Sequence, residues 1–285
     1  MATAERIMRG ANPSRRAAGA GFTLIEMIMV IVIMGIIAAV LSRFIAKPVQ
    51  GYLDSSRRAA LVDAADTALN RMTREIRLAL PNSIRVSGGN AIEFLRVRAG
   101  GRYRAEGAGN PLDLNAAAGT FDVLGAFDSG EVAPGSFSTG CGASGNGGCV
   151  VIYNTGQFGA DAYAEDDVAD ITAAGATSIS FTRATPFPLA SASQRFFVID
   201  GPVRFVCDTG TGEVRRYAGY GINAAMAAPL VGGNSALLVD KVSACTFSYA
   251  PGTATRGGLA TLEIRLTDQG ESIGLVQQIH VSNVP

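Results

Sequence analysis

Few side chains in this sequence have the types and spacing that enzyme chemistry requires. The only histidine is His280, near the C-terminus, so no nucleophile with a histidine base can be assembled. The sequence has no phosphate-binding loop, dinucleotide fingerprint or metal-binding motif. His280 alternates with Ile279 and Val281, as a strand residue would. We therefore predict that the protein is not an enzyme and needs no cofactor.

Cysteines offer the other covalent chemistry, and all four lie far downstream: Cys141, Cys149, Cys207 and Cys245. An even number of cysteines in an exported domain indicates disulfides, and four cysteines allow three connectivities. We favour sequential pairing, Cys141 with Cys149 and Cys207 with Cys245, because a flexible Gly-rich stretch separates the first two. A zinc site is the alternative, but the spacings match no zinc motif.

An acidic stretch could supply oxygen ligands for calcium. Its carboxylates are Asp161, Glu165, Asp166, Asp167 and Asp170. The stretch lacks the Asp-x-Asp-x-Asp-Gly order of an EF-hand, and charge clusters of this kind are usually solvated. We expect a polar surface loop over 159–176 and leave calcium binding open.

The most conspicuous element of the sequence is a long apolar segment near the N-terminus. It runs from Phe22 to Leu41, twenty residues, of which only Thr23 and Glu26 are polar. An α-helix of this length reaches about 30 Å, the hydrocarbon thickness of a bilayer. A core helix of a soluble domain would show a polar face, and this segment shows none. The sequence predicts a transmembrane part over 22–42.

Glu26 is the exception in this apolar run. A carboxylate costs about 2.5–3.5 kcal/mol at the centre of a membrane helix and less near its end. In one interpretation, Glu26 lies at the interface and reaches water. In the other, it has a partner charge. If the chain were cut after Gly21, the free α-amino group of Phe22 would lie within two turns of Glu26, on its own helix or on a neighbouring one.

Residues 1–21 are predicted to be a leader. They carry Arg6, Arg9, Arg15 and Arg16 but no apolar segment of their own, so an ordinary secretory signal fits poorly. An uncleaved signal anchor is the alternative. The basic leader favours a cytoplasmic N-terminus, although basic residues also follow the span. The cysteines favour export of the rest of the chain.

Beyond the span, the pattern predicts that the helix continues to about residue 80. One apolar stripe steps by three or four residues, through Leu61, Ala65, Ala68, Met72, Ile76 and Ala79. Pro48 should kink the helix, and Pro81 should stop it. We therefore expect one long kinked helix over 22–80, with its second half packed on a domain.

After Pro81 the apolar residues alternate with period two, which predicts strands. Residues 99–120 are rich in Gly, Ala and Asn and are expected to form a loop. The head, 81–285, should therefore be an antiparallel β structure with long loops packed on the helix, which makes the fold α+β. The strands expected after residue 120 are 121–127, 149–153, 178–183, 195–200, 203–207, 214–217, 236–239, 245–249, 259–267 and 272–281.

The residues around Gly21 resemble a known signature. Gly21-Phe22-Thr23-Leu24-Ile25-Glu26, after a short basic leader and before an apolar helix, is similar to the prepilin signature of type IV pilins and type II secretion pseudopilins. The resemblance implies cleavage by a membrane peptidase between Gly21 and Phe22 and N-methylation of Phe22. It also implies that Glu26 pairs with the Phe22 amine of an adjacent subunit during assembly.

The implied partners are prepilin peptidase, other major and minor pilins through the N-terminal helix, and the inner membrane. The implied location is a single-pass inner-membrane protein with its head in the periplasm, and then the pilus at the cell surface. The formal net charge is zero, so bulk charge indicates no nucleic-acid binding.

Further stretches resemble the O-type minor pilins of mannose-sensitive haemagglutinin (MSHA) pili. They are 71–77, 80–86, 194–198, 215–217, 242–249 and 278–285. The resemblance is weak over 99–176. It implies a minor pilin that is built into, or primes, an MSHA-type pilus. A J-like pseudopilin of type II secretion remains the alternative, because both kinds of protein need the same polymerising helix.

Overall fold

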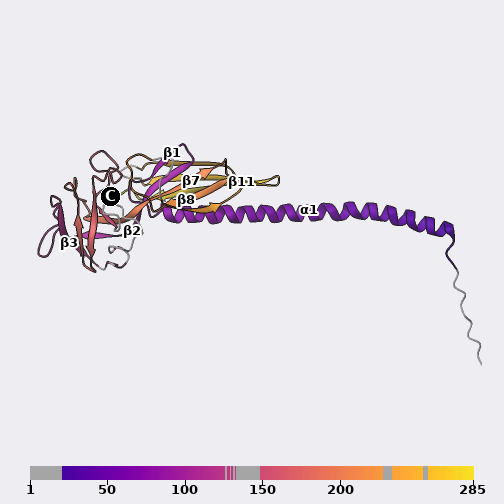
Figure 1. Cartoon of the computed structure of the whole chain (residues 1–285), viewed down its shortest axis with the longest axis horizontal. Coiled ribbons are helices and arrows are strands. Elements are labelled where there is room, and N and C mark those ends of the chain that lie inside the picture. The colour runs from indigo at the N-terminus through magenta and orange to yellow at the C-terminus, as the bar shows by residue number, and fades with distance from the viewer. Residues whose placement is uncertain are drawn as a thin grey trace, which may run out of the picture. The chain divides into compact units, whose positions relative to one another are not determined.

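The computed structural model describes residues 21–125, 127–128, 130, 132, 148–226, 233–252 and 256–285. The chain divides into two compact units, 1–54 and 55–285, and helix α1 (Leu24–Ile76) contributes residues to both. The strands all belong to the second unit, which is an antiparallel β head. The predicted α+β class is confirmed: one long apolar helix precedes the head in the chain (Figure 1).

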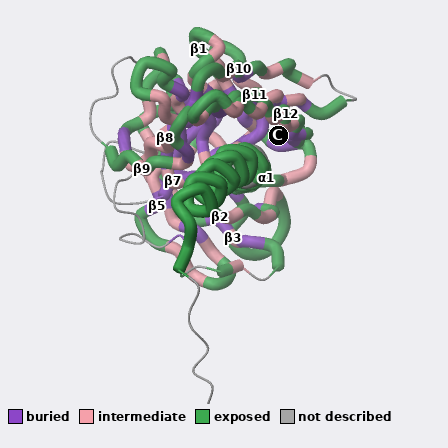
Figure 2. The backbone as a smooth tube through the Cα atoms, turned by 90° about the vertical axis from the view of Figure 1, so that its right-hand side faces the viewer, coloured by how far each residue is buried: buried purple, intermediate pink, exposed green. Residues whose placement is uncertain are grey.

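The first part of α1 has the composition of a membrane span. Its most apolar 18-residue window has a mean hydropathy of 2.9, and none of that window is buried. The end of the helix that faces the viewer in Figure 2 is accordingly exposed all round. Pro48 lies inside the helix without ending it, because the assigned helix continues to Ile76. The kink at Pro48 stays a prediction.

The helix ends four residues earlier than the predicted residue 80. The backbone after Ile76 turns and pairs with strand β2 (Ala91–Tyr103) instead. Leu80 N donates to Leu95 O at 2.8 Å, and Val97 N donates to Leu78 O at 2.8 Å. The apolar stripe continues to Ala79 in the sequence, but these backbone groups find partners in the sheet, so periodicity alone placed the end wrongly.

The predicted stripe on the second part of α1 is confirmed as its packing face. Leu61, Ala65, Ala68, Met72 and Ile76 are all buried. They form one core with apolar residues of both sheets of the head, among them Phe94, Phe205, Phe247, Leu262 and Ile279.

The larger sheet contains a closed ring of strands. Its strands are β1 (Arg85–Ser87), β2, β3 (Ala118–Leu124), β4 (Cys149–Val151), β5 (Val168–Ala174), β6 (Ser178–Thr182), β7 (Arg195–Asp208), β8 (Glu213–Ala218) and β9 (Asn234–Val239). The order is β1-β2-β3-β6-β5-β4-β7-β8-β9, and β2 also pairs with β7. Strands β2, β3, β6, β5, β4 and β7 therefore close on themselves. A separate core gathers there, in which the rings of Phe121 and Phe196 lie 5.4 Å apart.

The long strands β2 and β7 join this ring to the helix-packed part of the head. Their pairing runs from Ala91 opposite Val206 to Arg102 opposite Arg195, with two register shifts. The sequence predicted two strands over 195–207, but β7 is continuous, and Gly201 has the positive φ of 108° that this continuity requires. The first part of the predicted loop at 99–120 is strand up to Tyr103. The predicted loop at 159–176 contains β5.

The smaller sheet has three antiparallel strands, β10 (Val242–Ala250), β11 (Gly258–Asp268) and β12 (Glu271–Val281). The three strands are labelled next to one another in Figure 2. The hairpin between β11 and β12 turns at Gln269 and Gly270, which have φ angles of 47° and 93°. Two positive φ angles in a two-residue turn define type I′.

Candidate functional site

Gly21 and Phe22 precede the first residue of α1, so the bond between them lies outside the helix. Phe22 is 77% exposed, and a Cβ atom added at Gly21 would meet nothing within 4 Å. A peptidase needs an accessible backbone that is not held in helical hydrogen bonds. The predicted cleavage point has both properties, and the cleavage itself stays a prediction.

Thr23 is the N-cap of α1. Its Oγ1 accepts a hydrogen bond from the Glu26 backbone N–H at 3.3 Å, and its carbonyl accepts from Met27 N at 3.2 Å. The order Thr-x-x-Glu is the spacing of a capping box, a signal that the sequence analysis overlooked. The cap explains why the helix begins here and fixes Glu26 in its first turn.

Glu26 is exposed, and in the described part of the chain its carboxylate has no hydrogen-bond or ion-pair partner. A carboxylate in a first turn interacts favourably with the helix dipole. Its oxygens remain free to accept from a cation outside the chain. Both interpretations from the sequence, an interfacial residue and an assembly contact, are compatible with this geometry.

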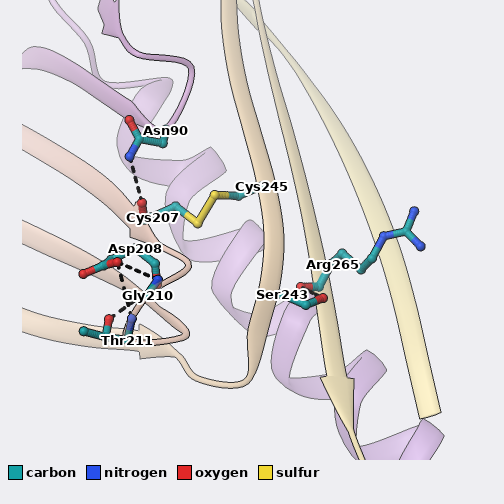
Figure 3. Close-up of a disulfide and its surroundings, with 8 residues drawn as sticks. All are labelled: Asn90, Cys207, Asp208, Gly210, Thr211, Ser243, Cys245 and Arg265. Carbon is teal, nitrogen blue, oxygen red and sulfur yellow. Dashed lines mark hydrogen bonds between the residues drawn. A yellow bond between two sulfur atoms is a disulfide. The ribbon is translucent and has the colours of Figure 1, made fainter. Parts of the chain in front are cut away.

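Cys207 and Cys245 form a disulfide, with an S–S distance of 2.00 Å and a Cα–Cα distance of 6.5 Å. The bond joins β7 of the larger sheet to β10 of the smaller one (Figure 3). Beside it, Asn90 Nδ2 donates to Cys207 O at 3.1 Å. Cys149 is also disulfide-bonded. Cys141 lies outside the described residues, so its pairing with Cys149 stays a prediction.

The acidic stretch does not form a metal site in the structure. No group of three His, Cys, Asp or Glu residues in the described part of the chain is placed to hold a metal ion. Asp161 Oδ1 accepts from Tyr163 N at 3.0 Å, and Asp166 Oδ2 accepts from Gly159 N at 3.0 Å. These two carboxylates hold the turns of the segment before β5.

Asp167 departs from the expected solvated loop. It is fully buried, and neither of its carboxylate oxygens has a hydrogen-bond partner among the described residues. Burial raises the pKa of Asp167 to about 7, and the neighbouring carboxylates of Asp161 and Asp166 add to this, while the charge of Arg183 opposes it. The expectation was wrong here because Asp167 directly precedes β5 and its carbonyl accepts from Ile152 N at 3.1 Å, which places it in the packed part of the head.

A buried cluster of charged side chains surrounds Glu93, which the sequence analysis missed. Glu93 is fully buried. Its Oε1 accepts from Arg85 Nε at 2.9 Å, and its Oε2 accepts from Arg204 Nε at 2.6 Å and from Tyr220 Oη at 2.7 Å. Burial, with Glu93 alongside, raises the pKa of Tyr220. The alternation of apolar and polar residues predicted the strand that contains Glu93. It did not indicate that Glu93 has partners 111 and 127 residues further along the chain.

This cluster connects several strands and loops of the head. The Arg85 guanidinium also lies 3.5 Å from the centroid of the Tyr163 ring, which connects β1 to the segment before β5. With both carboxylate oxygens of Glu93 occupied, the cluster leaves no free general base. His280, which the sequence placed in a strand, is an exposed residue of β12.

One family model matches the chain, over residues 16–42, and its description is the prokaryotic N-terminal methylation motif. The chain carries a type IV pilin-like signature. The motif contains Gly21, Phe22 and Glu26 together with the first part of α1. It supports a protein of the type IV pilin or pseudopilin type, with processing by prepilin peptidase, assembly with other pilins and anchoring in a membrane. No curated protein and no solved structure matches the chain significantly.

Proposed function

We propose that this chain is a minor pilin that is built into, or primes, a type IV pilus of the MSHA type. In this proposal the chain crosses the inner membrane once, with the head in the periplasm. Prepilin peptidase cuts between Gly21 and Phe22, and the new N-terminus is methylated. The observation that carries the proposal is the methylation motif, which lies directly on an apolar helix with a single carboxylate in its first turn.

Glu26 is the assembly contact in this proposal. Helices that bundle in a filament exclude water, and an unpaired carboxylate there is costly, whereas one paired with the Phe22 amine of a neighbour is not. The pair then sets the axial offset between subunits, as one buried polar residue can set the register of a helical bundle. Two observations support this role: the Glu26 carboxylate is exposed, and the cap at Thr23 engages the backbone N–H of Glu26 and leaves its carboxylate free to accept from another subunit.

Processing is tested by intact-mass measurement of the membrane-extracted protein. The expected mature chain begins at Phe22 and carries one added methyl group. A mature species that retains Arg15 and Arg16 would contradict the proposal.

Assembly is tested with Glu26→Ala. Membrane insertion and cleavage should stay intact, and insertion should improve slightly because a charge leaves the span. The amount in sheared pili should fall at least about tenfold, because the substitution leaves the Phe22 amine of the neighbour buried without a partner, and breaking a buried pair costs about 3–5 kcal/mol. Thr23→Ala is the matched control. It removes the cap but keeps the charge, and should assemble far better than Glu26→Ala. Normal amounts of Glu26→Ala in both fractions would leave Glu26 as an interfacial residue only.

A J-like pseudopilin of type II secretion is supported by the same motif and the same α+β layout. Deletion of the gene separates the two functions. Loss of surface pili with normal exoprotein release supports the minor pilin, and the reverse result supports the pseudopilin.

A further inference from the structure

A pocket of about 440 Å³ opens on the head beside the end of α1. Strand β2 contributes Gly100 and Gly101 to its wall, so this strand adds no side chain there that would fill the space. All the residues of the wall belong to the second compact unit, so the pocket lies within the head. The apolar side chains of the wall are those of Leu78, Ala79, Val97, Phe196 and Phe197.

The same wall carries three arginines, Arg77, Arg102 and Arg195, and no carboxylate side chain. Arg102 of β2 and Arg195 of β7 lie directly opposite each other, where like charges repel. Arg102 Nε donates to Ser193 O at 3.1 Å. None of the three arginines forms an ion pair with a described residue, Pro285 included. The pocket therefore favours an occupant that is apolar at its centre and negatively charged around it.

The head itself carries a loop with these two properties, over residues 154–166, which we call the knob. Phe158 at its tip is fully exposed. A single exposed apolar residue is ordinary on a protein surface, but this one is held in a defined turn. Ala160 N donates to Gln157 O at 2.9 Å, and Gly159 has the positive φ of 84° that a type II turn requires at this position.

Further hydrogen bonds fix the knob to the rest of the head. Gly159 N donates to Asp166 Oδ2 at 3.0 Å, and Asn154 Nδ2 donates to Pro81 O at 2.7 Å. A side chain on a fixed turn loses little conformational freedom when it is bound, so more of its burial contributes to affinity. An exposed aromatic side chain presented in this way suits the role of an anchor that enters a pocket of a partner.

The carboxylates around Phe158 give the knob a negative charge. Glu165 is exposed and has no hydrogen-bond or ion-pair partner among the described residues, while Asp161 and Asp166 accept only from backbone N–H groups. Arg183 also contacts this segment, but its Nη2 donates to the carbonyl of Asp166, and its guanidinium lies 3.7 Å from the Phe187 ring centroid. Three carboxylates against one arginine leave the knob negative.

We propose that the heads of two copies of this chain dock, with Phe158 of one copy inside the pocket of the other. The complementarity is twofold, because the apolar tip fits the apolar wall and the carboxylates meet the arginines. A carboxylate beside Arg102 and Arg195 would also relieve their repulsion. A chain that carries both a knob and a matching pocket associates with its own copies. This docking goes beyond the proposed function and does not depend on it, since every residue that it uses lies in the head.

The test uses two preparations of the full-length chain, mixed in detergent. One is labelled with ¹⁵N and carries a photoreactive benzoylphenylalanine in place of Leu78, a half-exposed residue of the pocket wall. The other is unlabelled and keeps Leu78. Mass spectrometry identifies the peptides that are joined after irradiation. The expected adduct joins the labelled peptide that contains position 78 to an unlabelled peptide that contains Phe158.

Variants of the unlabelled chain test the anchor. Phe158→Ala should lower the adduct about tenfold or more, because the burial of an aromatic ring is lost. Phe158→Leu keeps an apolar tip and should retain most of the adduct. Leu189→Ala is the matched control, since Leu189 is an exposed apolar residue outside the knob, and it should leave the adduct unchanged.

Charge reversal tests the carboxylates and the arginines. Arg195→Glu in the labelled chain should lower the adduct about threefold or more, because the knob is then repelled. Glu165→Lys in the unlabelled chain should restore a large part of it, since the new charges attract. Both residues lack ion pairs within the described part of the head, so neither change breaks a bond of the fold. Formation of the Cys207–Cys245 disulfide and resistance to protease confirm folding of each variant.

Three results would overturn the proposal. The first is the absence of an adduct, and the second is an adduct that joins only labelled peptides, which would form within one chain. The third is an adduct that survives Phe158→Ala unchanged, because association through α1 alone would produce it. None of these results concerns cleavage after Gly21 or the role of Glu26, so the proposed function is judged separately.

Discussion

The two parts of α1 differ in how their apolar residues are distributed and in what surrounds them. In residues 24–44 apolar side chains occur on every side, and all of these residues are exposed in the structure. In the second part, apolar residues follow one stripe, and that stripe is buried in the core of the head. In both parts, the sides of the helix that carry apolar residues correspond to the sides that must be removed from water.

Each part also carries a carboxylate, and the two are treated differently. Glu75, near the C-terminal end of α1, accepts from Arg216 Nε of β8 at 2.6 Å and from Arg71 Nε at 3.5 Å. Glu26 has no partner in the described part of the chain. Glu75 is thus neutralised within the fold, whereas Glu26 is the charge for which the proposed assembly supplies a partner.

The sharpest test of this comparison is a matched truncation of two methionines on the same helix. Met72 is fully buried, and Met29 is 56% exposed. Met72→Ala should lower the free energy of unfolding of the head by about 2–5 kcal/mol, because it leaves a cavity in the core. Met29→Ala should leave that free energy unchanged. Denaturant unfolding of the detergent-solubilised full chain measures both. Equal losses would mean that the first part of α1 also stabilises the head.

A second test measures how the buried carboxylate of Asp167 makes the stability of the head depend on pH. Burial raises the pKa of Asp167 from its ordinary value of 3.8 to about 7, so the folded chain binds a proton there that the unfolded chain has lost. Stability from this group is therefore full below about pH 4 and is lost as the pH rises toward 7. Between pH 5 and pH 8 the wild type should lose on the order of 2 kcal/mol.

Asp167→Asn should remove most of this slope and be more stable than the wild type at pH 8. Asp166→Asn is the matched control, since that carboxylate accepts a hydrogen bond from Gly159 N instead of lying unpaired. Thermal unfolding at a series of pH values gives the comparison. Parallel curves for the wild type and Asp167→Asn would contradict the buried, unpaired state of Asp167.

The smallest expected effect concerns Glu75 and Glu26, two of the carboxylates on α1. Glu75→Gln should lower the free energy of unfolding of the head by about 1 kcal/mol, because its bond with Arg216 is charge-assisted and only partly exposed. The loss should shrink at high salt. Glu26→Gln should not change head stability at all, while lowering assembly. A head destabilised by Glu26→Gln would break the distinction between the two parts of the helix.

Much of the fold could be predicted from local pattern. The alternation of Leu262, Ile264 and Leu266 placed β11, and the stripe through Met72 placed the packing face of α1. The errors occurred where distant partners decide the local structure. Residues 77–80 leave the helix because β2 offers hydrogen bonds to their backbone. The acidic segment looked solvated because the sequence does not show that the backbone of Asp167 pairs with Ile152 and that its side chain is buried.

The sequence by itself determined the start of α1, because every signal there is local: a cap at Thr23, a carboxylate three residues later and an apolar run of membrane length. Only the tertiary structure decided the head. Closure of the strand ring requires β2 to meet β7, and the cluster around Glu93 requires Arg204 and Tyr220 from far along the chain. The pocket beside the end of α1 likewise draws its wall from distant segments of the chain. Such features depend on pairings between distant segments, and no short pattern in the chain records which segments will meet.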